Sequence, residues 1–218
     1  MLKKISAIKI RKSDRLSKEI FGYFEKKYCL GSLAVAEAVS IASLCVQNIK
    51  PLSLLVISPS GQMKSQVTRE LCQIFPDNTY MIDSRFTPYG LSTKLGKCVL
   101  DNKTWVNNDM IRSFDGLSQV KIAELVGWLS EMMSEFRAGS RTALETELEA
   151  RMNMLGNIAM VSYHNIERKF VSSTLNERIV QFGFYVPRET VREKSRKETK
   201  PNPLEKIILK NTVITPKK

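Results

Sequence analysis

The sequence lacks the residues from which most small metal sites and disulfide frameworks are built. It contains one histidine, His164, and its few cysteines are widely separated, with no C-x-x-C pair: Cys29, Cys45, Cys72 and Cys98. Zinc sites require clustered cysteine and histidine ligands, and extracellular disulfide proteins are usually cysteine-rich. The sequence therefore predicts no zinc site and reduced cysteines, as in a cytoplasmic protein.

Long apolar segments are also absent. The longest candidate, residues 33–46, is interrupted by Glu37 and is shorter than the roughly 20 residues that span a bilayer. Residues 1–15 carry charge throughout and offer no apolar signal-peptide region. We therefore expect no membrane partner. With 218 residues and 43% hydrophobic content, the chain can bury one substantial core.

The net charge of +12 is confined to the two ends of the chain. Residues 1–27 hold nine Lys/Arg against three Asp/Glu, residues 188–218 hold ten against four, and residues 28–187 hold fifteen of each. Basic termini suit a nucleic acid, because each neutralised phosphate releases counterions. DNA is the predicted partner of these ends, and the alternative is that they are only solvated, soluble tails.

Hydrophobic periodicity divides the chain into helices and strands. Apolar residues recur every four positions from Leu16 to Tyr28, which predicts an amphipathic helix capped by Asp14. A second helix is predicted over 33–48. Short apolar segments then alternate with helical ones, and the predicted strands are 52–57, 79–83, 104–108, 158–163 and 179–186.

The longest later helix is predicted over 117–136. Strands that alternate with helices indicate an α/β sandwich with a mostly parallel sheet. The expected organisation is an N-terminal helical segment with a basic arm (1–50), a core (51–187) and a basic, flexible tail (188–218).

The segment "SPSGQMKSQ" has the outline of a phosphate-binding loop. In the pattern G-x-x-x-x-G-K-[ST], Lys64 and Ser65 match, whereas Ser58 and Met63 stand at the glycine positions. A predicted strand precedes the segment and a predicted helix follows it, as this motif requires. Backbone N–H groups of such a loop face phosphate oxygens. The predicted ATP-binding residues are Ser58, Pro59, Ser60, Gly61, Gln62, Met63, Lys64, Ser65 and Gln66.

Within the loop, Lys64 is expected to neutralise the β and γ phosphates, and the Ser65 hydroxyl to ligate Mg²⁺. Gly61 supplies an unusual backbone angle at the bend. The Met63 side chain would crowd the phosphates unless it turns away. The alternative is an ordinary strand-to-helix turn.

This loop resembles the Walker A loop of minichromosome-maintenance helicases, a branch of the AAA+ ATPases. "TWVNNDM" resembles their Walker B strand, with Asp109 at the metal-binding aspartate. Residues 123–165 resemble the helix, hairpin and sensor 1 strand that follow, with Ser162 near the sensor 1 position. "TLNERIVQFGF" resembles the arginine-finger segment, with Arg178 at the arginine.

The resemblance covers roughly residues 50–186. It implies a P-loop NTPase of AAA+ type with ATP, Mg²⁺ held by Ser65 and Asp109, and a homo-oligomeric ring or filament. The implied activity is that of a helicase-like motor or loader in DNA replication or remodelling. The chain carries no segment that resembles the N-terminal DNA-binding domain of those helicases, so a shortened ATPase of a mobile element fits better.

One difference from the pattern of these helicases concerns ATP hydrolysis. The family places a water-orienting glutamate after the Walker B aspartate, and here Met110 occupies that position. Asp83 is a candidate substitute. The alternatives are therefore a motor, a nucleotide-regulated DNA-binding or adaptor module with little hydrolysis, and, well behind, a phosphotransferase.

Overall fold

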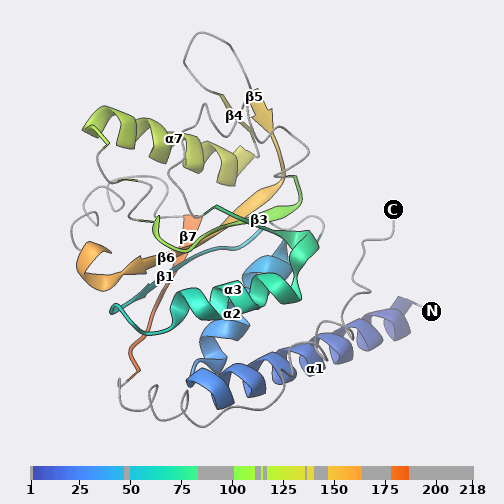
Figure 1. Cartoon of the computed structure of the whole chain (residues 1–218). Coiled ribbons are helices and arrows are strands. Elements are labelled where there is room, and N and C mark those ends of the chain that lie inside the picture. Colours follow the sequence, from blue (N-terminus) through green and yellow to red (C-terminus); the bar gives the residue numbers. More distant parts are fainter. Residues whose placement is uncertain are drawn as a thin grey trace.

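A central parallel sheet organises the protein (Figure 1). The computed structural model describes residues 2–46, 50–82, 101–110, 114, 117–135, 137–139, 147–163 and 178–186. Asp83, His164 and the basic tail 188–218 lie outside the described residues. Among the described helices, none is long and apolar enough to cross a membrane.

The sheet contains five strands in the order β2-β3-β6-β1-β7, and every neighbouring pair is parallel. The strands are β1 (Ser53–Ser58), β2 (Thr79–Met81), β3 (Lys103–Asn107), β6 (Met152–Ala159) and β7 (Ile179–Gly183). All six residues of β1 are buried, which explains its unbroken apolar character. The predicted α/β class with a five-stranded parallel sheet is confirmed.

The fourth predicted strand was misplaced. The strand β6 ends at Ala159, and residues 160–163 form a helical turn instead of the predicted strand 158–163. Two asparagines and a glycine interrupt the apolar pattern of β6, although seven of its eight residues are buried. Those polar side chains are accommodated by partners from the covering helices, which the local pattern does not reveal.

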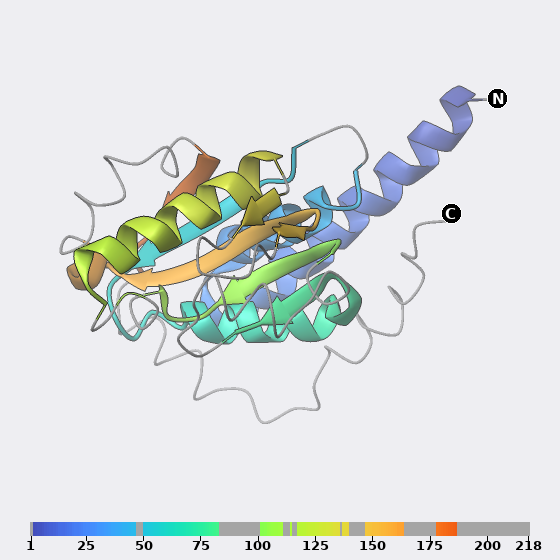
Figure 2. The same cartoon turned by 90° about the horizontal axis from the view of Figure 1, so that it is seen from above.

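Three helices cover one face of the sheet. They are α1 (Leu2–Tyr28), α2 (Gly31–Ser43) and α3 (Lys64–Ile74), and a 3-10 turn, η1 (Pro76–Asn78), leads from α3 to β2. The expected cap at Asp14 is wrong, because α1 begins twelve residues earlier, at Leu2. The sequence before Asp14 contains neither glycine nor proline and is rich in lysine, arginine and isoleucine, so nothing breaks the helix. In both views its amino-terminal half extends past the sheet (Figures 1 and 2).

The predicted apolar face of α1 is confirmed at Ile20, Phe24 and Tyr28, which are buried. The second helix, in contrast, ends at Ser43 and is shorter than the predicted segment 33–48. The helices α1, α2 and α3 share one hydrophobic cluster with the sheet, which we call the α1–α3 cluster. Glu70 on α3 fixes α1 in place, since it accepts hydrogen bonds from Lys27 Nζ at 2.9 Å and Tyr23 OH at 3.0 Å.

The opposite face is covered by α7 (Gln119–Glu135). The predicted helix 117–136 is therefore confirmed to within two residues, although Val120 is exposed rather than part of its buried face. A two-stranded antiparallel hairpin of β4 (Arg137–Gly139) and β5 (Glu147–Glu149) follows α7. The helices on both faces and the sheet between them make three layers (Figure 1).

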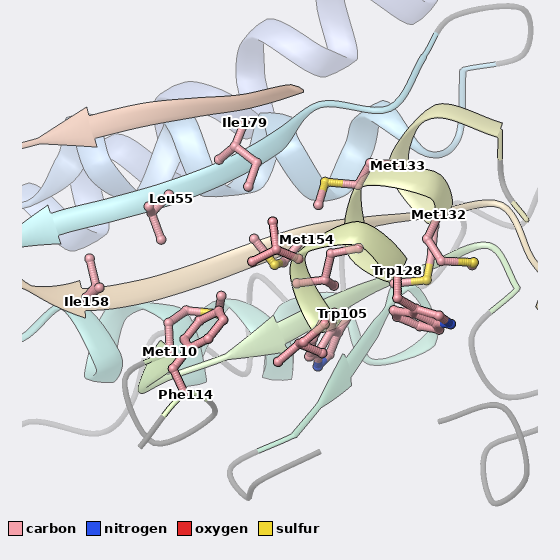
Figure 3. Close-up of a cluster of buried hydrophobic side chains, with 14 of the residues drawn as sticks. Leu55, Trp105, Met110, Phe114, Trp128, Met132, Met133, Met154, Ile158 and Ile179 are labelled. Carbon is pink, nitrogen blue, oxygen red and sulfur yellow. The ribbon is translucent and has the colours of Figure 1, made fainter. Parts of the chain in front are cut away.

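The α7 cluster is the set of buried side chains between α7 and the sheet. It contains both tryptophans and five methionines: Trp105, Trp128, Met110, Met132, Met133, Met152 and Met154. In Figure 3 the labelled side chains of α7 and the strands point toward one another across this layer.

Candidate functional site

The loop of residues 59–63 connects the carboxyl end of β1 to the amino end of α3. The strand β1 lies between β6 and β7, and α3 carries the chain away from β7 to the far edge strand β2. Ligands of open α/β sheets bind at the carboxyl ends of the strands where neighbouring connections diverge in this way. The predicted loop therefore occupies the position in the sheet that favours ligand binding.

The loop backbone adopts the left-handed conformation at two positions. Gly61 has φ 79° and Met63 has φ 60°. Glycine adopts positive φ without steric cost, which explains why this motif has a glycine where Met63 stands. The Met63 side chain packs against the α1–α3 cluster. It therefore turns away from the loop, which meets the condition under which methionine is compatible with a phosphate there.

The amino end of α3 is suited to an anion. Gln66 and Val67 donate their backbone N–H groups to the Met63 carbonyl, and no side chain caps this helix. The N–H groups at Lys64 and Ser65 precede the first intrahelical bond, so they have no acceptor within the helix. Together with the helix dipole, these groups make a site for negative charge at the start of α3.

Lys64 is a buried cation, 8% exposed, at this helix terminus. Its ammonium is 3.5 Å from the carbonyl oxygens of both Ser58 and Pro59, at the long limit of hydrogen bonding. Burial lowers the pKa of Lys64, and the negative charge of Asp109 opposes that shift. Two weak carbonyl contacts and one carboxylate compensate poorly for the lost hydration of an ammonium, so an added anion would be stabilised here.

Ser65 and Asp109 meet at the same edge of the sheet. Ser65 Oγ donates, at 3.3 Å, to the carbonyl oxygen of Asn108, the residue directly before Asp109. The Asp109 backbone N–H donates to Asn107 Oδ1 at 3.0 Å, which holds the turn after β3. A hydroxyl and a carboxylate are oxygen ligands of the kind that Mg²⁺ uses together with substrate phosphates. The described residues contain no group of three or more acidic, cysteine or histidine side chains that would bind a metal by themselves.

Met110 is fully buried in the α7 cluster and does not face the loop. A Cβ added at Gly156 would lie 2.8 Å from Met110 Cγ, so the glycine makes room for this side chain. The position after Asp109 is therefore directed into the core. A water-orienting carboxylate at this position would require a different backbone course after β3.

A buried polar network beneath the loop was missed by the sequence reasoning. Asn157 Nδ2 on β6 donates to Thr68 Oγ1 on α3 at 2.9 Å, and its distance to Asn108 Oδ1 is 3.4 Å. Thr68 Oγ1 lies 3.0 Å from both Glu37 Oε1 on α2 and the Lys64 carbonyl oxygen. The network thus joins α2, α3, β6 and the end of β3 around the start of α3.

Glu37 is the ionisable member of this network. Burial raises its pKa to about 8, partly offset by its hydrogen bond with Thr68. A protonated Glu37 can donate to the Thr68 hydroxyl, which then donates its one hydrogen to the Lys64 carbonyl. With Glu37 neutral, the Thr68 hydroxyl can both accept from Glu37 and donate to the Lys64 carbonyl, although Glu37 Oε2 has no hydrogen-bond partner among the described residues. An ionised Glu37 would compete with the Lys64 carbonyl oxygen for the one Thr68 hydrogen.

The other predicted site residues take different positions. Gln66 donates to Glu70 Oε1 at 3.0 Å, along α3, and Gln62 forms hydrogen bonds with Val186 rather than facing the loop's open side. Ser162 lies in the helical turn that follows β6, at the same edge of the sheet as the loop. Arg178 is exposed and directly precedes β7, whose first residue pairs with Ser53.

Arg178 therefore lies at the amino ends of the strands and Lys64 at their carboxyl ends, separated by about the length of a six-residue strand, roughly 20 Å. The fold does not bring them together within one chain. A role for Arg178 at a phosphate near Lys64 would therefore require a second copy of the chain. A comparison with protein-family models and one with curated proteins find no match to this chain.

Proposed function

We propose that the chain binds Mg-ATP at residues 58–66 and acts as an AAA+-like ATPase in DNA replication or remodelling. The observation that carries the proposal is the buried Lys64 ammonium at the uncapped start of α3, with long contacts to two loop carbonyls and the charge of Asp109 nearby. A triphosphate would supply the missing anion, and its Mg²⁺ would be held by Ser65 and Asp109. The bound metal would neutralise charge on the phosphates.

The arrangement of elements supports the same proposal. The helix, hairpin and strand that the resemblance implies after Asp109 occur in that order as α7, β4–β5 and β6. The buried Met110 favours nucleotide binding over rapid hydrolysis, so an ATP-regulated DNA-binding or adaptor module is the second candidate. Steady-state ATP hydrolysis, measured with and without single-stranded and duplex DNA, separates the two. Hydrolysis stimulated by DNA favours the motor or loader, and binding without turnover favours the module.

The central test is the affinity for Mg-ATP after Lys64→Ala. The substitution removes the charge that faces the phosphates, and we expect at least about tenfold weaker binding, or 1.4 kcal/mol. Arg69→Ala is the matched control, because it removes a positive charge from the exposed side of the same helix. Equal affinities of parent and Lys64→Ala in a titration would falsify the phosphate-binding assignment.

If the chain hydrolyses ATP, Arg178 is the proposed finger that a neighbouring copy supplies. Arg178→Ala should then abolish turnover and leave Mg-ATP binding intact, because the arginine is far from Lys64 within its own chain. Undiminished turnover in the variant removes this role from Arg178.

DNA binding is proposed for the two basic ends. Residues 1–27 and 188–218 each carry a net charge of +6, whereas the body between them is neutral. The logarithm of DNA affinity should fall with the logarithm of salt concentration, by about 0.9 for each neutralised phosphate. Removal of 188–218 should flatten this slope and leave Mg-ATP affinity unchanged. An unchanged slope would exclude the tail as a DNA contact.

A further inference from the structure

Gln62, in the loop, forms two side-chain hydrogen bonds with the segment that follows β7. Its amide Nε2 donates to the Val186 carbonyl oxygen, and its Oε1 accepts from the Val186 N–H, each at 2.7 Å. One side chain thus satisfies both backbone groups of one residue, as a neighbouring strand would. We call this paired contact the Gln62–Val186 clasp.

The clasp lies in a protected environment. Gln62 is 1% exposed, which is unusual for a polar residue in a surface loop. Phe182, Phe184 and Val186 pack against the α1–α3 cluster. The Phe184 N–H donates to the Ile57 carbonyl of β1 at 3.1 Å, so the backbone pairing of β7 with β1 continues toward the clasp. Water is largely excluded from Gln62, and loss of its partners would leave polar groups poorly compensated.

The position of Gln62 in the loop explains how the Gln62–Val186 clasp can restrain the loop backbone. Gln62 lies between the two residues with positive φ, Gly61 and Met63, so it is the point at which the loop turns from β1 toward α3. Fixing its side chain limits how far the backbone on either side can move. The segment 184–186 therefore restrains the N–H groups that would face a phosphate.

We propose that Gln62 is a positioning residue, and that the Gln62–Val186 clasp couples phosphate occupancy of the loop to the segment 184–186. This inference rests on the proposed binding of Mg-ATP. Coupling of this kind is reciprocal: if the clasp favours the binding conformation of the loop, a bound phosphate stabilises the clasp.

The experiment compares the parent protein with Gln62→Met, which keeps the size of the side chain and loses both hydrogen bonds. Mg-ATP should bind about tenfold more weakly to this variant, since two net hydrogen bonds of ordinary strength no longer hold the loop. Tyr185→Ser is the matched control, because Tyr185 is 69% exposed in the same segment. It should leave the affinity unchanged.

Amide hydrogen exchange gives a readout that a purely structural role would not change. In the parent, Mg-ATP should slow exchange of the Val186 N–H, which belongs to the clasp, more than that of the Phe184 N–H, which bonds to β1. In Gln62→Met the preferential effect at Val186 should disappear. The measurement on the parent keeps the proposal testable even if the variant folds poorly.

The results distinguish a failure of the proposed Mg-ATP binding from a failure of the proposed coupling. A parent that binds no Mg-ATP overturns the proposed function, and the coupling with it. A parent that binds Mg-ATP without preferential protection of Val186 overturns the coupling alone. Equal affinities of folded Gln62→Met and parent also overturn it.

Discussion

The side chains buried against the two faces of the sheet differ in composition. The α1–α3 face contains a buried polar network in which Thr68 is hydrogen-bonded to both Glu37 and Asn157. The core on the α7 face is instead rich in tryptophan and methionine side chains. Hydrogen bonds have fixed directions, whereas methionine is unbranched and fills irregular spaces. The face that presents the loop is therefore specified more rigidly than the face opposite it.

This difference predicts unequal costs for the same truncation on the two faces. Leu71 on α3 and Leu129 on α7 are both almost completely buried. Leucine-to-alanine substitutions in cores cost about 2.7–5 kcal/mol, and less where neighbours can close the cavity. We expect Leu71→Ala near the upper end and Leu129→Ala near the lower end, because Leu129 belongs to the methionine-rich α7 cluster. Urea unfolding of both variants measures this, and an equal or larger cost for Leu129→Ala would remove the contrast.

The polar network predicts a specific dependence on pH. Below pH 4.5, the ordinary pKa, both folded and unfolded states carry the Glu37 proton. Between that value and about 8, the unfolded state releases the proton and the folded state keeps it. The free energy of unfolding should therefore fall with rising pH by up to about 1.4 kcal/mol per unit.

The Glu37→Gln variant lacks this titration, so its stability relative to the parent should rise across the same pH window. Glu124→Gln, at an exposed position on α7, is the matched control and should show no such trend. Chemical unfolding at several pH values measures both differences. A constant difference between Glu37→Gln and parent would mean that Glu37 is ionised in the folded protein.

The smallest effect is expected at the loop itself. A non-glycine residue in the left-handed region costs about 1–2 kcal/mol, so Met63→Gly relieves strain at φ 60°. The same substitution loses the packing of the Met63 side chain and increases the freedom of the unfolded chain. We expect stability within about 1 kcal/mol of the parent and unchanged Mg-ATP affinity. A tenfold gain in affinity would show that the methionine side chain obstructs the phosphates.

Local patterns in the sequence were sufficient to predict the centre of the fold. The apolar strand β1, the loop with Lys64 and Ser65, and the buried face of α1 were each predicted from adjacent or regularly spaced residues. These features depend on short-range geometry, so periodicity and motif spacing could identify them. For the orientation of Met63 the sequence gives only a condition, because it does not show where the side chain packs.

Features that depend on distant partners could not be predicted in this way. The Asn153 amide on β6 donates to the Ser40 carbonyl on α2 at 2.8 Å, which explains how a polar residue is buried within a strand. Gln62 and Val186 are 124 residues apart, and neither carries a local signal of its partner. The sequence thus located the loop of the candidate site, whereas the network and the clasp around the loop became apparent only in three dimensions.

The placement of the tryptophans gives the protein a built-in optical reporter. Trp105 and Trp128 both lie in the α7 cluster, and the chain contains no other tryptophan. Intrinsic tryptophan emission therefore reports on one side of the sheet alone, whereas far-ultraviolet circular dichroism records helices on both sides. Unfolding curves from the two signals coincide if the layers separate in one cooperative step. The protein thus needs no added fluorophore to reveal whether α7 can loosen while the loop-bearing face stays folded.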